Sequence, residues 1–252
     1  MWLFGPNPGG FFGKTDPSHN HLAPLAVNNL NLSLYNGATF TTAGDFTNNV
    51  TLRVDGSRTQ TSSFTVSGAL QNNGNLYVSD GSTVTIAGSF TNNGYLGFQL
   101  DPNSGSSGGT LTVGGAFKSV DNSGTLTGQW NLRSGEVYYD GAGGVNGTQD
   151  ITTIASGAEV ELLGPNAGLF GKTDTSHNHL APLAVNNGSF ESSQAFTTEG
   201  DFTNNGTVDL ATYTVGGNTW TGSLTVSGAF HNVDNSGNLT GQWSFGERRS
   251  LL

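Results

Sequence analysis

The chain has 252 residues, of which only 10% are charged and 34% are hydrophobic, whereas 39 are Gly. Eight Lys and Arg residues against 18 acidic ones give a net charge of −10, which excludes the clustered cations of a nucleic-acid-binding groove. Cys is absent, which excludes a disulfide framework, and no apolar run approaches the ~18 residues of a membrane span. We therefore expect neither nucleic acid as a partner nor membrane insertion.

A His-containing segment stands near the start of the chain and occurs twice. Residues 13–21 read GKTDPSHNH, and residues 171–179 read GKTDTSHNH. Both interrupt the surrounding pattern, so we expect loops. An Asp and two His at the spacing H-x-H suit a divalent metal, because alternate residues of an extended segment face the same way. The candidate ligands are Asp16, His19, His21, Asp174, His177 and His179, and the alternative is a copied insertion whose His bond locally. The sequence implies no other cofactor.

A repeat of about 20 residues follows. The pattern T-Φ-x-G-x-Φ-x-N-N-G-x-Φ, in which Φ is apolar, occupies residues 65–76 and again 85–96. Apolar and polar residues alternate over four to six positions and then break at Gly or Asn-Asn-Gly, which is typical of short strands between tight turns. Related Asn pairs recur before and after these units. Asn in stacked turns can hydrogen-bond to the Asn above and below, so we expect a turn ladder that includes Asn49, Asn73, Asn93 and Asn205.

Two all-β architectures fit such strands, an antiparallel sandwich or barrel and a solenoid. The same turn recurs at the same phase, which favours the solenoid, because each coil then stacks on the last and like side chains form ladders. We predict one domain over residues 1–252, a right-handed parallel β-helix (β-solenoid) with loop insertions. Its predicted core includes Val66, Leu70, Leu76, Val84, Ile86, Phe90 and Leu96.

A partial internal duplication, about 5–132 and 164–245, supports this fold. The motif at Gly44 recurs at Gly200, an offset of 156, whereas the motif at Ala116 recurs at Ala229, an offset of 113. The second copy has therefore lost 156 minus 113, or 43, residues, which is close to two repeats. Loss of two whole coils leaves a solenoid in register, whereas the same loss would remove strands from the sheets of a sandwich.

With these repeats, the chain resembles the β-strand repeats of large bacterial surface proteins, the adhesin-like and autotransporter-passenger type of parallel β-helix. The resemblance rests on the Gly, Asn, Thr and alternating aliphatic residues of the coils and covers most of the chain. It implies an elongated extracellular or cell-surface protein that assembles with copies of itself.

Some parallel β-helices are polysaccharide lyases or hydrolases, which use paired carboxylates on one face. Here the acidic residues are spread at roughly one per turn and mostly adjoin Gly or Asn, as turn residues do; examples are Asp45, Asp80, Asp121, Asp140 and Asp150. We therefore expect a structural or adhesive protein and not an enzyme.

The alternative class is a ligand-binding solenoid. Hydroxyl pairs at alternate positions, such as Thr39/Thr41, Thr83/Thr85 and Thr110/Thr112, can form flat ranks like those of Thr-x-Thr solenoid antifreeze proteins, although Thr is favoured in any strand. Exposed aromatics would serve a glycan instead. Trp130 and Trp243 are the candidate platform for a glycan partner.

The two ends of the sequence lie within the repeat pattern and not in a polar capping segment. We therefore expect end-to-end self-assembly into a filament, since uncapped solenoid ends expose strand edges that pair with another chain. The alternative is that the ends are fragment boundaries, with Arg248 and Arg249 acting as charges that keep the chain monomeric.

Overall fold

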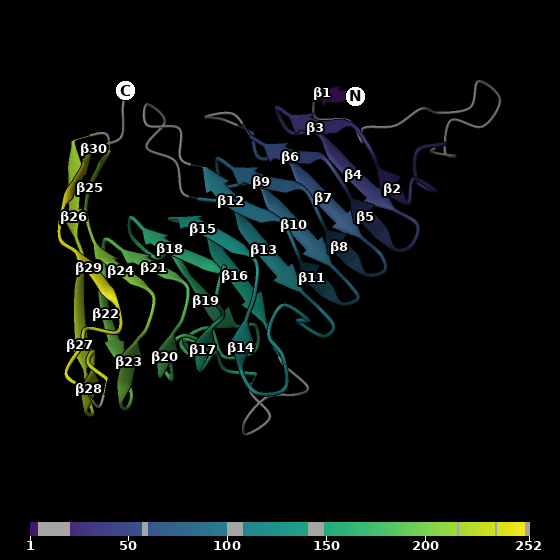
Figure 1. The fold of residues 1–252 in the computed structure, drawn as a ribbon. Helices are drawn as coiled ribbons and strands as arrows, with labels where there is room; N and C mark the ends of the chain where they lie inside the picture. The colour runs from purple at the N-terminus through teal and green to yellow at the C-terminus, as the bar shows by residue number, and fades with distance from the viewer. Residues whose placement is uncertain are drawn as a thin grey trace.

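The strands stack into a parallel β-helix (Figure 1). The structure is a computed structural model that describes residues 1–4, 21–56, 60–99, 108–140, 149–215, 217–234 and 236–249. Within these ranges the regular elements are all strands, and pairing between coils is parallel throughout. The predictions of an all-β chain and of a parallel β-solenoid are thus confirmed. The right-handedness of the solenoid stays a prediction.

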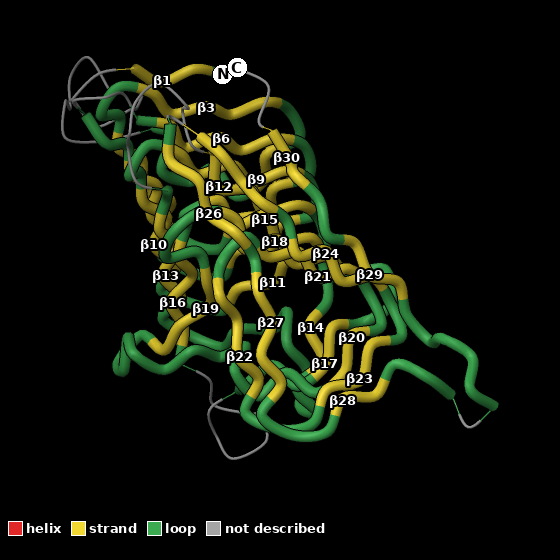
Figure 2. The backbone as a smooth tube through the Cα atoms, turned by 90° about the vertical axis from the view of Figure 1, so that its left-hand side faces the viewer, coloured by secondary structure: helices red, strands yellow, loops and turns green. Residues whose placement is uncertain are grey.

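Each coil places strands on three faces, which Figure 2 shows in a view turned by 90° from that of Figure 1, with the last coils toward the viewer. The first face is a ten-stranded sheet: β1 (Trp2–Phe4), β3 (Asn31–Tyr35), β6 (Thr51–Asp55), β9 (Asn75–Ser79), β12 (Tyr95–Gln99), β15 (Gln129–Arg133), β18 (Glu159–Leu163), β21 (Ser189–Ser192), β24 (Thr207–Leu210) and β29 (Gln242–Ser244). The second face begins as a six-stranded sheet: β4 (Thr39–Thr42), β7 (Ser63–Val66), β10 (Thr83–Ile86), β13 (Thr110–Val113), β16 (Glu136–Tyr139) and β19 (Gly168–Gly171). It continues as a two-stranded sheet: β22 (Ala195–Thr198) and β27 (Ser223–Val226).

The third face is divided between a four-stranded and a five-stranded sheet. The four-stranded sheet holds β2 (Val27–Asn28), β5 (Phe46–Asn48), β8 (Leu70–Asn72) and β11 (Phe90–Asn92). The five-stranded sheet holds β14 (Thr125–Leu126), β17 (Thr153–Ile154), β20 (Val185–Asn186), β23 (Phe202–Asn204) and β28 (Phe230–His231). A three-stranded sheet near the end combines an antiparallel hairpin with a parallel strand: β25 (Thr212–Val215), β26 (Asn218–Thr221) and β30 (Glu247–Arg249).

The core is a set of apolar ladders along the inside of the coils. Alternation places every second strand residue inward, so that β10 reads exposed, buried, exposed, buried. All predicted core residues are at most 1% exposed: Val66, Leu70, Leu76, Val84, Ile86, Phe90 and Leu96. Burying each such side chain contributes roughly 1.5–3 kcal/mol. The core prediction is therefore confirmed.

The strand register shows what the second copy of the duplication has lost. In the first copy the third face runs through four stacked positions: Phe46, Leu70, Phe90 and Phe117. In the second copy Phe202 pairs directly with Phe230. The first copy thus has three coil-to-coil pairings where the second copy has one. Two whole coils are missing from the second copy, and the strands on either side of the loss stay in register, as the sequence predicted.

The core also contains a ladder of buried Asn side chains. In the strand Leu70–Asn72, alternation turns Asn72 inward beside Leu70, and Asn48 and Asn92 occupy the same position in the adjacent coils. Asn48 Nδ2 donates to Asn72 Oδ1 at 2.7 Å, and Asn72 Nδ2 donates to Asn92 Oδ1 at 2.7 Å. The other N–H of Asn72 donates to the Tyr95 carbonyl at 3.0 Å. Each buried amide is thereby satisfied only through its neighbouring coils.

The second face is interrupted where the His-containing loop is inserted. After β19 the chain folds back along the outer edge of that strand, and Phe170 forms an antiparallel bridge with Asn178. The Gly171 N–H donates to the His177 carbonyl at 2.9 Å, and the His179 N–H donates to the Leu169 carbonyl at 2.9 Å. The loop thus occupies the edge on which the next coil would pair, and the six-stranded sheet ends at β19.

The buried and exposed Asn of one turn give a matched test of this ladder. Asn72→Ala should lower the free energy of unfolding by about 2–4 kcal/mol, because it leaves Asn48 Nδ2 and Asn92 Oδ1 buried without their partner. Asn73→Ala removes an exposed amide and should change it by less than about 0.5 kcal/mol. Urea denaturation measures both, and equal losses would contradict the inner ladder.

Candidate functional site

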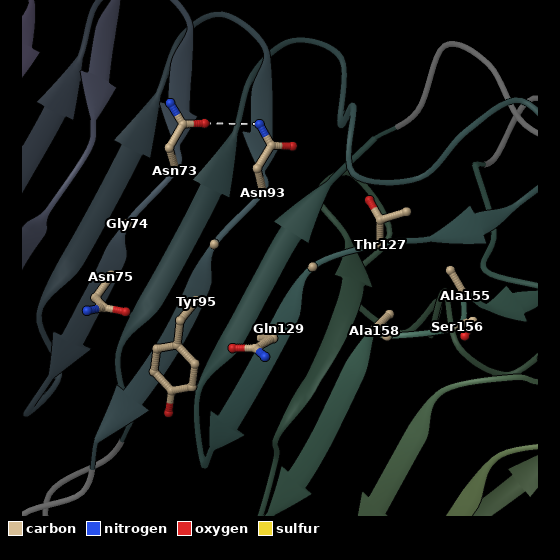
Figure 3. A pocket seen from close by; sticks show the side chains of 13 residues that line it. Asn73, Gly74, Asn75, Asn93, Tyr95, Thr127, Gln129, Ala155, Ser156 and Ala158 are labelled. Atoms are coloured by element: carbon tan, nitrogen blue, oxygen red, sulfur yellow. Dashed lines mark hydrogen bonds between the residues drawn. The ribbon is translucent and has the colours of Figure 1, made fainter.

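An outer Asn ladder runs along the corner between the third face and the ten-stranded sheet. Asn73 Nδ2 donates to Asn49 Oδ1 at 3.0 Å, and Asn93 Nδ2 donates to Asn73 Oδ1 at 3.0 Å, the bond drawn in Figure 3. Asn49 itself donates to Asn29 at 2.8 Å. In the second copy Asn205 donates to Asn187 at 2.9 Å. All four turn-ladder residues therefore bond to the Asn of an adjacent coil.

A groove of about 430 Å³ lies beside this ladder (Figure 3). Its lining comes from four successive coils: residues 73–75, 93–95, 127–129 and 155–158. Tyr95 and Gln129 project from paired positions on β12 and β15. Side-chain amides, backbone groups and one aromatic ring suit a polar, uncharged ligand, so a glycan would find its hydrogen-bond partners here.

Gly97, two residues after Tyr95, makes room for the Tyr95 ring at the edge of this groove. A Cβ atom at Gly97 would lie 2.4 Å from Tyr95 Cε1, so the absence of a side chain there lets the ring lie against the strand. Burial, together with the charge of Glu161, raises the pKa of Tyr95 to about 12. The phenol therefore stays neutral and available as a hydrogen-bond donor across the physiological range.

Acidic side chains gather on the outer face of the ten-stranded sheet. The register aligns Asn131, Glu161, Glu191 and Asp209 on four successive strands. Asn131 Nδ2 donates to Glu161 Oε2. Burial, with the nearby charge of Glu191, raises the pKa of Glu161 to about 7. Sequence reasoning missed this row, because insertions of different length separate residues that stacking brings together.

The Trp residues do not form the predicted platform. Trp130 is fully buried, and its Nε1 donates to the Thr127 carbonyl at 2.8 Å. It lies in the inward rank of β15 between Leu96 and Val160, so the prediction of an exposed Trp130 is wrong. Trp243 is partly exposed on β29, where its Nε1 donates to Asn232 Oδ1 at 2.9 Å.

Two His and one Asp converge beside the inserted loop. Asp150 precedes β17, and His177 and His179 lie in the connection from β19 to β20. Asp150 Oδ1 is 2.6 Å from His177 Nε2 and 3.0 Å from His179 Nδ1. The His179 ring is 2% exposed and stacks on Tyr139 at a centroid distance of 4.0 Å. One carboxylate oxygen thus faces both imidazoles.

The carboxylate in this cluster differs from the one that the sequence predicted. Asp174 is exposed and accepts hydrogen bonds from the Ser176 hydroxyl at 2.6 Å and the Ser176 N–H at 3.1 Å, which lower its pKa. It therefore caps its own turn, and Asp150 from the preceding coil takes its place. Of the first set, Asp16 and His19 lie outside the described residues, and His21 is exposed.

Comparison with known proteins gave no match to a family model, a curated protein or a solved structure. Within the described residues, no helix is long and apolar enough to cross a membrane.

The raised pKa of Glu161 predicts a pH-dependent stability. Between its unfolded value of 4.5 and its folded value of about 7, the native protein binds more protons than the unfolded chain, so stability falls as pH rises through this range. Glu161→Gln should remove on the order of 1 kcal/mol of that fall, because partial exposure screens the full effect. Urea denaturation at pH 5 and pH 8 measures it. The control is Glu199→Gln, which changes an exposed carboxylate. If the stability of Glu161→Gln falls between pH 5 and pH 8 by as much as that of the wild type, the pKa of Glu161 is not the cause.

Proposed function

We propose that the chain is a non-enzymatic structural or adhesive β-solenoid of the extracellular space or cell surface, and that its copies stack end to end into a filament. The resemblance to adhesin-like repeats supports the class and the location. The low content of charged residues and the three-faced stack of coils suit a scaffold. The end-to-end contact is supported most directly by the two copies of one sequence motif.

Residues 116–130 and 229–243 are nearly identical in sequence but differ in exposure. In the first copy Val120 and Leu126 are 3% and 0% exposed. In the second copy the equivalent Val233 and Leu239 are 56% and 74% exposed. The first copy is covered by the coil that follows, where Leu126 pairs with Ile154. The second copy lies in the last coil of the described residues, where no further described coil covers it, so the side chains that are buried in the first copy are exposed here.

A second copy of the chain fits this surface. The strands that end the three faces are β27, β28 and β29 at this end and β1, β2 and β4 at the other, and Figure 1 shows the two sets at opposite ends of the stack. Open edges accept a further strand. Head-to-tail stacking continues the parallel pairing, and a head-to-tail contact that does not close into a ring produces a filament.

Substitution of Leu239 tests the contact. Leu239→Asp should weaken association at least tenfold, because burying Leu contributes roughly 1.5–3 kcal/mol and a charge in its place opposes burial. Sedimentation velocity at micromolar concentration measures it, and Thr85→Asp, which places the same charge at an exposed position of β10 in the middle of the stack, is the control.

Mixing the variant with the wild type tests the polarity of the contact. In head-to-tail stacking, Leu239→Asp still binds an open wild-type end and terminates growth, so assemblies shorten as its fraction rises. A wild-type chain that stays monomeric on concentrating would overturn the proposal.

Ice binding is a second candidate, and the outer ranks of the six-stranded sheet favour it. On β4, β7, β10 and β13 one rank holds Thr39, Ser63, Thr83 and Thr110, and the other holds Thr41, Thr65, Thr85 and Thr112. The strand geometry spaces these hydroxyl and methyl groups by about 4.8 Å between strands and about 6.7 Å along them. Such a regular array can order water in a lattice.

This candidate predicts thermal hysteresis in the wild-type protein. Thr85→Lys, at the centre of the array, should remove more than half of it, because the longer charged side chain breaks the flat surface. Thr91→Lys on β11 places the same change on another face and should leave it intact. Thermal hysteresis of the two variants, measured by nanolitre osmometry, decides the point, and an inactive wild type would eliminate ice binding.

A further inference from the structure

The Asp150, His177 and His179 cluster carries an inference independent of assembly. We propose that these three side chains bind one divalent first-row transition-metal ion, with Zn²⁺ the best fit. Their ligand atoms all lie within 4.8 Å of one another. Two imidazole nitrogens and a carboxylate oxygen form a donor set that such ions prefer. Ca²⁺ fits poorly, because it requires six to eight oxygen ligands.

The hydrogen bonds of His179 provide the strongest argument. Its Nδ1 faces Asp150 Oδ1 at 3.0 Å, and its Nε2 faces the Tyr139 carbonyl oxygen at 3.1 Å. Both partners are acceptors, whereas a neutral imidazole has a single N–H, so one of the two contacts would lack a proton. An ion on Nδ1 resolves this conflict. The ring then coordinates through Nδ1 and donates Nε2–H to Tyr139, the outer partner that a metal-bound His usually has.

The other ligands leave room for the ion and for a further ligand. The His177 side chain is 33% exposed and the Asp150 side chain is 13% exposed, so solvent reaches one side of the cluster. Zn–ligand bonds of about 2.0–2.2 Å place tetrahedral donor atoms roughly 3.4 Å apart. His177 Nε2 and Asp150 Oδ1, now 2.6 Å apart, would therefore separate slightly, and water would supply the fourth ligand.

The position of the cluster indicates what the ion does. Asp150 belongs to the coil that precedes the inserted loop, and both His belong to the loop, 27 and 29 residues later. The Ile151 N–H donates to the His179 carbonyl at 2.8 Å, so the backbone already brings the two segments together. The ion would cross-link them at the point where the six-stranded sheet ends, which makes the site structural.

Binding of Zn²⁺ and Co²⁺ to the full chain, freed of metal with a chelator, tests the site. Titration calorimetry should give micromolar or tighter affinity, and Co²⁺ should show the visible absorption of a four-coordinate His-containing site. Zn²⁺ at a hundredfold excess over its Kd should raise Tm by roughly 5 °C or more.

The variants discriminate between the two carboxylates. Asp150→Asn and His177→Ala should each weaken binding at least tenfold, whereas Asp174→Asn should change it less than twofold. All measurements use the background His19→Ala/His21→Ala, which removes both imidazoles of the first His segment. Affinity weaker than about 100 µM in this background, or affinity unchanged in Asp150→Asn, would overturn the proposal and leave an Asp150–imidazolium ion pair.

Discussion

Each coil of this solenoid depends on a neighbour on either side, and the rest of the structure follows from that constraint. Parallel strands about 4.8 Å apart place every side chain directly on its equivalent in the next coil. A single coil cannot fully surround its own inward residues, and Leu76 is buried between Leu52 and Leu96 of the two adjacent coils. Stability therefore comes from contacts between coils.

The same constraint governs the polar groups and the two irregular places in the stack. Asn72 is tolerable in the core only because Asn48 and Asn92 satisfy its amide from either side. At β19 the chain supplies a substitute neighbour, the His-containing loop, which occupies the strand edge and places its two His against Asp150. At the last coil the described residues supply no such cover, and Leu239 is exposed.

The sequence could predict what depends on local alternation and on the repeat. The strands, the core positions such as Val66 and Ile86, the outer ladder at Asn73 and the loss of two coils all follow from period and phase. The inner ladder was available in principle, because Asn72 is two residues from Leu70 and shares its inward face, but the Asn-Asn-Gly signature indicated only a turn. The prediction for Trp130 failed for the same reason: the alternation along its strand places it on the inward face, beside Leu132, and this was not applied. Asp150 and the row at Glu161 could not be found, because loops of unequal length hide which residues stack.

Hydrogen exchange measured by mass spectrometry on residues 116–132 and 229–245 of the same chain tests the dependence of each coil on its neighbours most directly. At low protein concentration we expect amides of residues 116–132 to be protected and those of 229–245 to exchange rapidly. On concentrating, residues 229–245 should gain protection comparable to that of their copy, as a second chain covers them. Equal protection of the two segments in the dilute monomer, or rapid exchange of 229–245 at every concentration, would contradict this account.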